Sequence, residues 1–468
     1  MKDKRMESWW EGHFNEFISD LSSLVEVPSV SVPDPGNTEA PFGKPCNEAL
    51  RVMQSIAARY GFKAENDGNH YLKLLWEGRE KGTVGLFCHL DVVPAGPGWS
   101  YPEFKLTREE DIFLGRGTSD NKGPALTTLY SLRYLRETGW EPEHTILLFF
   151  GVNEECGMAD IKYFTGRNPM PLFSLVPDSR FPVCYGEKGI AVLDAEHYLA
   201  PDTIIREWKS GVASNSVPCQ AEAVVAMPYD AIACLGKRSR FKLADLGNGL
   251  TRVTAYGEAA HAMTPEKGIS AQNVLAEGLI GTKFLPFSDE SFLSSLLTLF
   301  GDCHGMGIGV PFEDDLSGRL THIGGFSSYD GTGPFRQNIN IRYNVQAEYD
   351  QLISIVEAKL KENGFILTQA RGSRPMSISK DHPMVRQLTA LVNEEYGTDL
   401  GPYVMGGGTY ARHLRNAVAY GTRMPGEEDV FGPARGHAHQ PDEYVSREKL
   451  EAGFSIYSKA IPLVDAWA

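Results

Sequence analysis

Two adjacent glutamates, Glu154 and Glu155, directly follow the apolar run "TILLFFGV" at residues 145–152. A glutamate pair usually lies in a solvated loop, because charged side chains are rarely buried without a partner. Neighbouring side chains on an extended segment, however, point to opposite faces. Such a pair can therefore divide two tasks, with one carboxylate binding a cation and the other transferring a proton.

Further polar residues follow other apolar runs in the same way. The run "TVGLFC" (83–88) leads into His89, and "LFSLVP" (172–177) leads into Asp178. Ligands of open parallel sheets bind at the carboxyl ends of the strands, so these residues are expected to meet at one sheet edge. Asp120 in "GRGTSDNKG" and His439 in "HAHQPDE" are two more candidates. Taken singly each has an ordinary explanation, such as an Asx-turn or helix cap for Asp120.

Asp91 lies two residues after His89. On an extended segment residues i and i+2 share a face, so the Asp91 carboxylate can hydrogen-bond the ring nitrogen of His89 that does not bind a metal. Such a carboxylate fixes the tautomer of a metal-binding histidine. The alternative is a solvated loop acid.

The elements that must position these residues alternate between strands and helices. Apolar spacing predicts helices at 7–25 and 47–60, a third helix at 123–139 between the first two apolar runs, and buried strands at the three runs. This order predicts an α/β fold with a mostly parallel sheet. After "GEKG" (186–189), strand-like runs alternate with helices predicted at 270–285, 289–300 and 348–363. From about residue 382 the helix-rich α/β pattern of the N-terminal part returns. We therefore expect a catalytic domain built from 1–187 and 381–468, with an inserted α+β lid domain at 188–380.

Composition excludes several classes of protein. A formal net charge of −15 over 468 residues argues against a nucleic-acid partner, because phosphate binding needs a basic surface. No apolar run approaches the roughly 18 residues of a membrane span, and the charged, aromatic start "MKDKRMESWWEGHF" does not match a secretory signal. The seven cysteines form no CxxC pair, which suggests reduced thiols. We expect a cytoplasmic protein without membrane contact.

Several motifs together resemble one known family. "HLDVVPAGPGW", "GRGTSDNKGP", "NEECG", "PDSRFPVCYGEKG", "HAMTPEKGISA", "GGGTYAR" and "HQPDE" occur in this order along nearly the whole chain. They resemble the co-catalytic zinc peptidases that include acetylornithine deacetylase and carnosinase. "PDSRFPV", "GEKG" and "GGGTYAR" are most similar to the PepV branch of bacterial dipeptidases.

The resemblance implies a role for each matching residue. It implies that His89 and Asp178 hold one metal ion, that Glu155 and His439 hold the other, and that Asp120 bridges the two. Two histidines and three carboxylates suit Zn²⁺, with Mn²⁺ or Co²⁺ as possible substitutes, and two ions per chain are implied. Glu154 is then the general base, and Asp91 counts with the catalytic residues. His437 competes with His439 on spacing, but only His439 fits the family's His-x-x-Asp-Glu pattern.

The resemblance also implies substrate contacts. His261 in "GEAAHAMTP" would stabilise the oxyanion, and Arg342 in "INIRYNV" would bind the substrate carboxylate. Asn215 would help to hold the scissile carbonyl. The glycine-rich "GGGTYAR" would present backbone N–H groups at a helix start, through Gly407, Gly408 and Thr409. For His261 and Arg342, local packing or surface pairing is the alternative.

The predicted activity is hydrolysis of dipeptides with a free N-terminus by a water that two zinc ions activate, in a monomeric enzyme with small peptide substrates. An N-acyl amino acid deacylase or desuccinylase is the first alternative. A peptide-binding relative without turnover is the second, and it is disfavoured because the expected base and all five expected ligands are present. Side-chain preference among dipeptides is not predicted.

Overall fold

The computed structural model describes residues 3–424, 430–432 and 435–468, which form two compact units. Unit 1 comprises Met1–Tyr185, Ile378–Tyr403 and Gly408–Ala468, and unit 2 comprises Gly186–Ser377 and Val404–Gly407. The short segment Val404–Gly407 was assigned from sequence to the first domain, whereas the structure places it in unit 2. The reason is local pairing, because Lys188 N–H donates to the Met405 carbonyl at 2.9 Å and Arg342 Nη1 donates to the Gly406 carbonyl at 3.2 Å.

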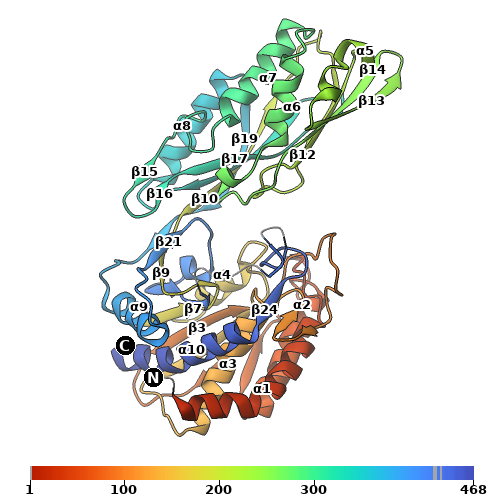
Figure 1. The fold of residues 1–468 in the computed structure, drawn as a ribbon. Coiled ribbons are helices and arrows are strands. Elements are labelled where there is room, and N and C mark those ends of the chain that lie inside the picture. Colours follow the sequence, from red (N-terminus) through yellow and green to blue (C-terminus); the bar gives the residue numbers. More distant parts are fainter. Residues whose placement is uncertain (1–2, 425–429, 433–434) are drawn as a thin grey trace. The chain divides into compact units, whose positions relative to one another are not determined.

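Unit 1 is built on a mixed sheet with a parallel centre (Figure 1). The parallel strands lie in the order β6 (Thr145–Gly151), β3 (Thr83–His89), β7 (Phe173–Val176) and β22 (Ala417–Ala419). Antiparallel strands flank them, namely β2 (Tyr71–Trp76) and β1 (Ala64–Asp67) beside β6, and β9 (Cys184–Glu187) beside β22. Strands β3, β6 and β7 are buried almost throughout, as expected for apolar runs covered on both faces. The predicted fold class is confirmed.

Helices surround this sheet. They are α1 (Lys4–Val25), α2 (Lys44–Arg59), α3 (Lys122–Glu137), α4 (Ala159–Thr165), α9 (Pro383–Tyr396) and α10 (Arg447–Trp467). Helix α1 starts at Lys4 and not at residue 7, because the Asp3 carboxylate caps it by accepting the N–H of Arg5 at 2.9 Å. Helix α3 packs against β3 and against both α1 and α10, so both ends of the chain contribute to one core.

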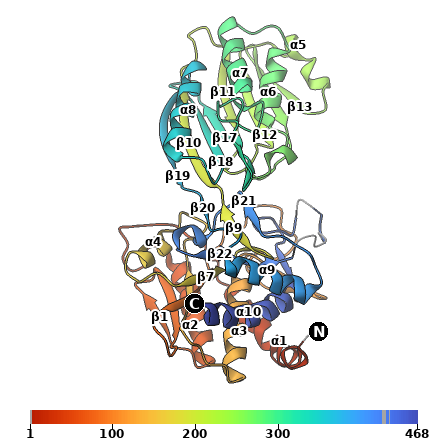
Figure 2. The same cartoon turned by 90° about the vertical axis from the view of Figure 1, so that its left-hand side faces the viewer.

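Unit 2 has an antiparallel sheet with helices packed on it (Figure 2). The strand order is β13 (Phe241–Gly247), β14 (Leu250–Tyr256), β12 (Gln220–Val225), β11 (Ile205–Ser210), β17 (Thr321–Tyr329), β18 (Phe335–Tyr343), β10 (Gly189–His197) and β19 (Ile366–Ser373). The helices are α5 (Tyr229–Ile232), α6 (Ala271–Ile280), α7 (Phe287–Phe300) and α8 (Tyr349–Glu362). Helix α6 ends at Ile280, before the predicted residue 285, because Gly281 forms its C-cap and Pro286 lies before α7.

Shorter elements complete the described chain. They are β4 (Thr107–Glu109), β5 (Ile112–Leu114), β8 (Ser179–Arg180), β15 (Glu313–Asp314), β16 (Gly318–Arg319), β20 (Met376–Ser377), β21 (Tyr403–Met405), β23 (Thr422–Arg423), β24 (Tyr444–Ser446), and the 3₁₀ helices η1 (Leu235–Lys237), η2 (Pro265–Lys267) and η3 (Tyr410–His413). Within the described ranges, no helix combines the length and the apolar character needed to span a bilayer.

Candidate metal centre and active site

The register of β3 and β6 brings their carboxyl ends together. His89 lies opposite Gly151, and the Leu90 N–H donates to the Gly151 carbonyl at 2.8 Å. After β6 the chain turns around Asp160, whose Oδ2 accepts the N–H groups of Val152 at 2.7 Å and Asn153 at 2.8 Å. The glutamate pair therefore leaves the sheet at the edge where His89 ends its strand, as predicted from the sequence.

Asp120 lies between two histidines. Its Oδ1 is 3.1 Å from His89 Nε2, and its Oδ2 is 3.3 Å from His439 Nε2. Asp178 Oδ2 lies 3.7 Å from the same His89 nitrogen, and Glu155 Oε1 lies 2.9 Å from the same His439 nitrogen. The five residues thus form two donor groups that share one carboxylate. All five predicted ligands are brought together, and among the two candidate histidines of "HAHQPDE" it is His439 that contacts Asp120 and Glu155.

The donor atoms lie close enough to converge on cations. Ligand atoms of His89, Asp120 and Glu155 lie within 4.8 Å of one another, as do those of His89, Glu154 and Asp178. Imidazole nitrogens together with carboxylate oxygens suit Zn²⁺, Mn²⁺ or Co²⁺. A buried group of this composition also needs positive charge, because carboxylates removed from water repel one another. The residues present therefore fit a metal centre.

The pKa values of the cluster reflect this need for positive charge. Burial alone would raise the pKa of Asp120, but hydrogen bonds from His439 and His89 hold it well below its usual value. Burial and the nearby Asp120 charge raise the pKa of Asp178 to about 7 and also raise that of Glu155. Although burial favours neutral imidazoles, the surrounding carboxylates raise the pKa of His89 well above normal and that of His439 to about 11. These pKa shifts show that the surrounding carboxylates favour positive charge at both histidines.

Glu154 has a different environment from Glu155. The residue is 9% exposed, and its Oε1 is buried without a hydrogen-bond partner among the described residues. Burial, together with the charge of Asp178, raises the pKa of the Glu154 carboxyl well above its usual value. Glu155 instead contacts His439. A carboxylate that is close to donor groups but is not itself paired can exchange a proton with a bound molecule.

Asp91 positions both the histidine and the glutamate pair. Its Oδ1 and Oδ2 accept the backbone N–H groups of Glu154 at 3.1 Å and Glu155 at 3.0 Å. His89 Nδ1 lies 3.0 Å from the Asp91 carbonyl oxygen and 3.4 Å from Oδ1 of its carboxylate. Both oxygens are acceptors, so Nδ1 carries the proton and Nε2 faces Asp120. The predicted contact with the ring is therefore present, but the two backbone hydrogen bonds were not predicted.

Glu443 also has a role that was not predicted from the sequence. Its buried Oε1 accepts three backbone N–H groups of the turn that carries Asp120, those of Gly117 at 3.1 Å, Ser119 at 2.9 Å and Asp120 at 3.0 Å. Its Oε2 accepts Arg116 Nη1 at 2.6 Å. Glu443 could have been noticed, because it is the last residue of the "HQPDE" motif. Its backbone partners lie more than 300 residues away in the sequence, so the motif alone does not identify them.

Asn121 is a second unpredicted contributor. Its Nδ2 donates to the Pro177 carbonyl at 2.6 Å, and its Oδ1 accepts the His89 N–H at 3.4 Å. The side chain therefore links the residue after Asp120 to the residue before Asp178 and to His89. The buried amide of Asn121 thus connects the three segments that supply the proposed ligands His89, Asp120 and Asp178.

The predicted substrate residues lie mainly in unit 2. Asn215 and His261 are adjacent there, since the Ala262 N–H donates to the Asn215 carbonyl at 2.9 Å. Arg342 lies in β18, and its Nε donates to Asn340 Oδ1 at 2.9 Å. Gly407 belongs to unit 2, whereas Gly408 and Thr409 belong to unit 1. The helix start expected at "GGGTYAR" is the single turn η3, which Thr409 caps by accepting the Ala411 N–H at 3.1 Å.

Comparison with known proteins identifies the family and supports the fold. Residues 85–462 match the family described as "Peptidase family M20/M25/M40". A protein of Staphylococcus haemolyticus, named "Putative dipeptidase SH1171", is 30% identical over 460 residues, which cover 95% of this chain and 96% of the relative. A Staphylococcus epidermidis protein named "Putative dipeptidase" is 29% identical over 460 residues, covering 96% of each chain.

Solved structures show the same fold at low sequence identity. The yeast (Saccharomyces cerevisiae) di-peptidase Dug1p superposes with a TM-score of 0.58 at 14% identity, with 97% of each chain covered. Human carnosine dipeptidase 1 superposes with a TM-score of 0.56 at 15% identity, with 99% of each chain covered. The chain belongs to peptidase family M20/M25/M40, a family of metal-dependent hydrolases. The family predicted from the sequence motifs is confirmed, and the narrower likeness to the PepV branch stays a prediction.

Proposed function

We propose that the protein is a metal-dependent dipeptidase that hydrolyses the amide bond of dipeptides with a free N-terminus. The observation that carries this proposal is the position of Asp120, which offers one carboxylate oxygen to each of two histidines. A carboxylate shared in this way can hold two cations at once, as hydrolysis by a pair of metals requires. Binding a peptide without hydrolysing it does not require such a carboxylate. The staphylococcal relatives, whose printed names describe dipeptidases, support the same substrate class.

We assign His89 and Asp178 to one cation, Glu155 and His439 to the other, and Asp120 to both. Zinc is the proposed metal, with two ions per chain. When bound, such a pair polarises a carbonyl and lowers the pKa of water. Glu154 takes a proton from the water whose oxygen attacks the peptide carbonyl carbon. It then passes that proton to the nitrogen that leaves as an amine when the C–N bond breaks.

Asp91 and Glu443 hold these groups in place through backbone hydrogen bonds. In unit 2, His261 keeps its proposed role as the hydrogen-bond donor to the oxyanion, and Asn215 its role at the scissile carbonyl. Arg342 is assigned to the substrate carboxylate, and the backbone of Gly407, Gly408 and Thr409 to the same end of the substrate. The proposed enzyme acts as a monomer in the cytoplasm.

A substrate panel tests this function. Metal-stripped protein is supplied with Zn²⁺, Mn²⁺ or Co²⁺ and offered dipeptides, the same dipeptides with acetylated N-termini, and N-acetyl and N-succinyl amino acids. We expect hydrolysis of the free dipeptides to return with metal, and the blocked compounds to remain intact. Preferential cleavage of N-acyl amino acids would show that the enzyme is a deacylase and not a dipeptidase. Dipeptide binding without turnover under every metal would identify a non-catalytic relative.

A further inference from the structure

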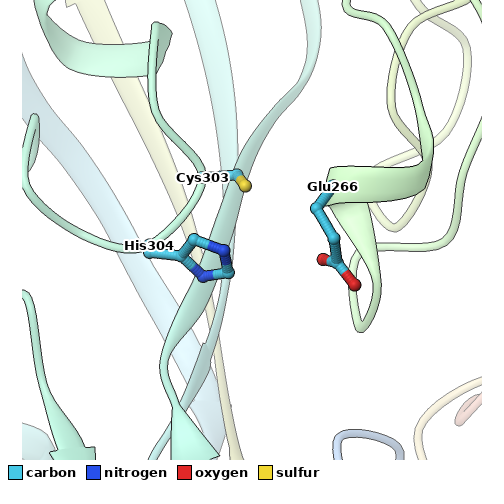
Figure 3. A group of neighbouring side chains, drawn as sticks. All are labelled: Glu266, Cys303 and His304. Atoms are coloured by element: carbon cyan, nitrogen blue, oxygen red, sulfur yellow. The ribbon is translucent and has the colours of Figure 1, made fainter.

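A second group of potential metal ligands lies within unit 2, apart from the residues assigned to the catalytic metals. Glu266, Cys303 and His304 each offer one ligand atom, and these atoms lie within 4.8 Å of one another. Figure 3 shows Cys303 and His304 on one segment of chain and Glu266 on another, with the three side chains directed toward a shared space. From this arrangement we propose that Glu266, Cys303 and His304 bind a Zn²⁺ ion that cross-links two loops of unit 2.

The ligand chemistry favours zinc over a hard cation. A thiolate, an imidazole and a carboxylate form a mixed S/N/O set, which suits Zn²⁺ and disfavours Mg²⁺ or Ca²⁺. Glu266 is exposed, and no ion pair of the described residues restrains its carboxylate, so this side chain can adjust to the bond lengths that a bound ion sets.

The histidine is already oriented for binding. His304 Nδ1 lies 3.1 Å from the Leu320 carbonyl oxygen, which can only accept. Nδ1 therefore carries the proton in the neutral ring, and Nε2 keeps the lone pair that a metal requires. A backbone carbonyl that fixes the tautomer in this way is a common partner of zinc-binding histidines.

The loop that carries Cys303 and His304 is held by groups that are not ligands themselves. The Asp302 carboxylate accepts the N–H groups of His304 at 2.7 Å, Met306 at 3.2 Å and Gly307 at 2.6 Å. Buried His322 accepts the Gly305 N–H at its Nδ1, at 3.1 Å, and its Nε2 lies 3.0 Å from the Leu299 carbonyl. Both ring nitrogens of His322 are thereby occupied, so His322 is not a fourth ligand. A cavity of about 200 Å³ is lined in part by Glu266 and Cys303, and a water in it could supply a further ligand.

The cross-link would join segments that are distant in sequence. Glu266 lies in η2 (Pro265–Lys267), shortly after His261, while Cys303 and His304 follow the end of α7 at Phe300. A bound ion would therefore restrict the loop that carries His261. The inference of a metal site does not depend on the proposed dipeptidase activity, because every residue in it lies outside the assigned catalytic set.

Cobalt absorption provides a selective test. The proposed catalytic ligands contain no sulfur, so a near-ultraviolet thiolate-to-cobalt band in the metal-stripped, full-length protein titrated with Co²⁺ would report a cysteine ligand. We expect this band in the wild type, its loss in Cys303→Ser and in His304→Ala, and at least a roughly 10-fold weaker cobalt affinity in Glu266→Gln. Cys156→Ser is the matched control, since exposed Cys156 lies beside Glu155, and it should keep the band.

Thiol protection tests the same site without any substitution. Saturating Zn²⁺ should slow alkylation of Cys303, as measured by peptide mass mapping, while exposed Cys219 and Cys234 serve as internal references with unchanged rates. An undiminished cobalt band in Cys303→Ser would overturn the proposal. Equal alkylation of Cys303 with and without zinc would overturn it as well, and this second result is independent of whether any variant folds.

Discussion

Glu154 and Glu155 are adjacent in sequence, and the Asp91 carboxylate holds the backbone N–H groups of both. Their side chains nevertheless have different surroundings. Glu155 contacts His439 within the donor cluster, whereas Glu154 has a buried oxygen without a partner among the described residues. This difference supports Glu155 as a metal ligand and Glu154 as a general base. The variants Glu154→Gln and Glu155→Gln are therefore expected to differ in their effects.

Glu154→Gln should reduce kcat by about 10²–10⁴-fold, the usual contribution of a general acid–base group, with little change in metal content. Glu155→Gln should mainly lower metal content, because an amide is a weaker ligand than a carboxylate. Metal analysis by mass spectrometry, combined with kinetics at saturating zinc, separates the two effects. Loss of metal in Glu154→Gln together with recovery of its activity on metal addition would show that the roles are reversed.

Glu443 is predicted to act through the position of Asp120. In Glu443→Gln the Asp120 turn loses a charged acceptor and Arg116 loses its buried counter-charge, and breaking such a pair costs about 3–5 kcal/mol of folding stability. We expect lower stability by chemical denaturation and a lower zinc affinity, although Glu443 is not a ligand. Exposed Glu448, early in α10, provides the control, and Glu448→Gln should leave both properties unchanged. Unchanged zinc affinity in folded Glu443→Gln would refute the positioning role.

Metal binding should depend on pH in a defined direction. Burial lowers the pKa of His439, but Asp120 and Glu155 outweigh burial and raise it to about 11, so the metal-free ring carries a proton at neutral pH. A metal ion needs the lone pair and must displace that proton. Zinc affinity should therefore fall as pH is lowered from about 8 to about 6, and binding should release protons. Calorimetry in buffers of different ionisation enthalpy measures the release, and a pH-independent affinity without proton release would contradict the expectation.

At the scale of elements, the turn after β6 depends on close packing at Gly151. A Cβ at this position would collide with Tyr410 Oη and with Asp160 Oδ2, and Asp160 is the acceptor for the Val152 and Asn153 N–H groups. The turn that carries Glu154 therefore requires a residue without a side chain at the end of the strand.

Gly151→Ala should destabilise the protein by about 1–3 kcal/mol through overpacking. It should also lower kcat by up to about 10²-fold, because it displaces the turn that carries Glu154. Gly401→Ala is the control, since a Cβ at Gly401 meets nothing within 4 Å and its φ is not positive. Denaturant unfolding and steady-state kinetics are the measurements. Wild-type kcat in Gly151→Ala would show that the turn tolerates the extra methyl group.

The accuracy of the sequence-based predictions also differs between elements. Strands β3, β6 and β7 were located closely, because uninterrupted apolar runs are characteristic of doubly covered strands. The edge at which His89, Asp178 and the glutamate pair meet followed from the parallel topology. The contributions of Glu443 and Asn121 could not be predicted in this way, since each depends on backbone groups brought close only by the tertiary fold. That of Asp160 depends on the path of a local turn, because its backbone partners lie only seven and eight residues away. The predicted end of α6 was wrong, because the helix ends before Gly281 whereas the apolar pattern in the sequence continues beyond this residue.

At the scale of the whole molecule, we predict the oligomeric state of the protein. The inserted segment predicted at 188–380 is longer than a small α/β lid requires, and the resemblance to the PepV branch implies an enlarged lid that takes the place of a partner subunit's lid. We therefore expect a monomer whose specific activity does not change on dilution. Sedimentation at the concentrations used for the assays provides the measurement. Activity that falls together with dissociation of a dimer would refute the prediction.

Unit 1 is assembled from three separate stretches of chain, and its last stretch supplies both His439 and Glu443. During synthesis on the ribosome, the long continuous part of unit 2 is complete before either residue emerges, and domains generally fold as units from the N-terminal side. A nascent chain that ends before His439 has only His89 beside Asp120, and Arg116 has no Glu443. We therefore expect the catalytic metals to be acquired only after this last stretch has been synthesised, so that a truncated product that ends before His439 would be inactive as a hydrolase.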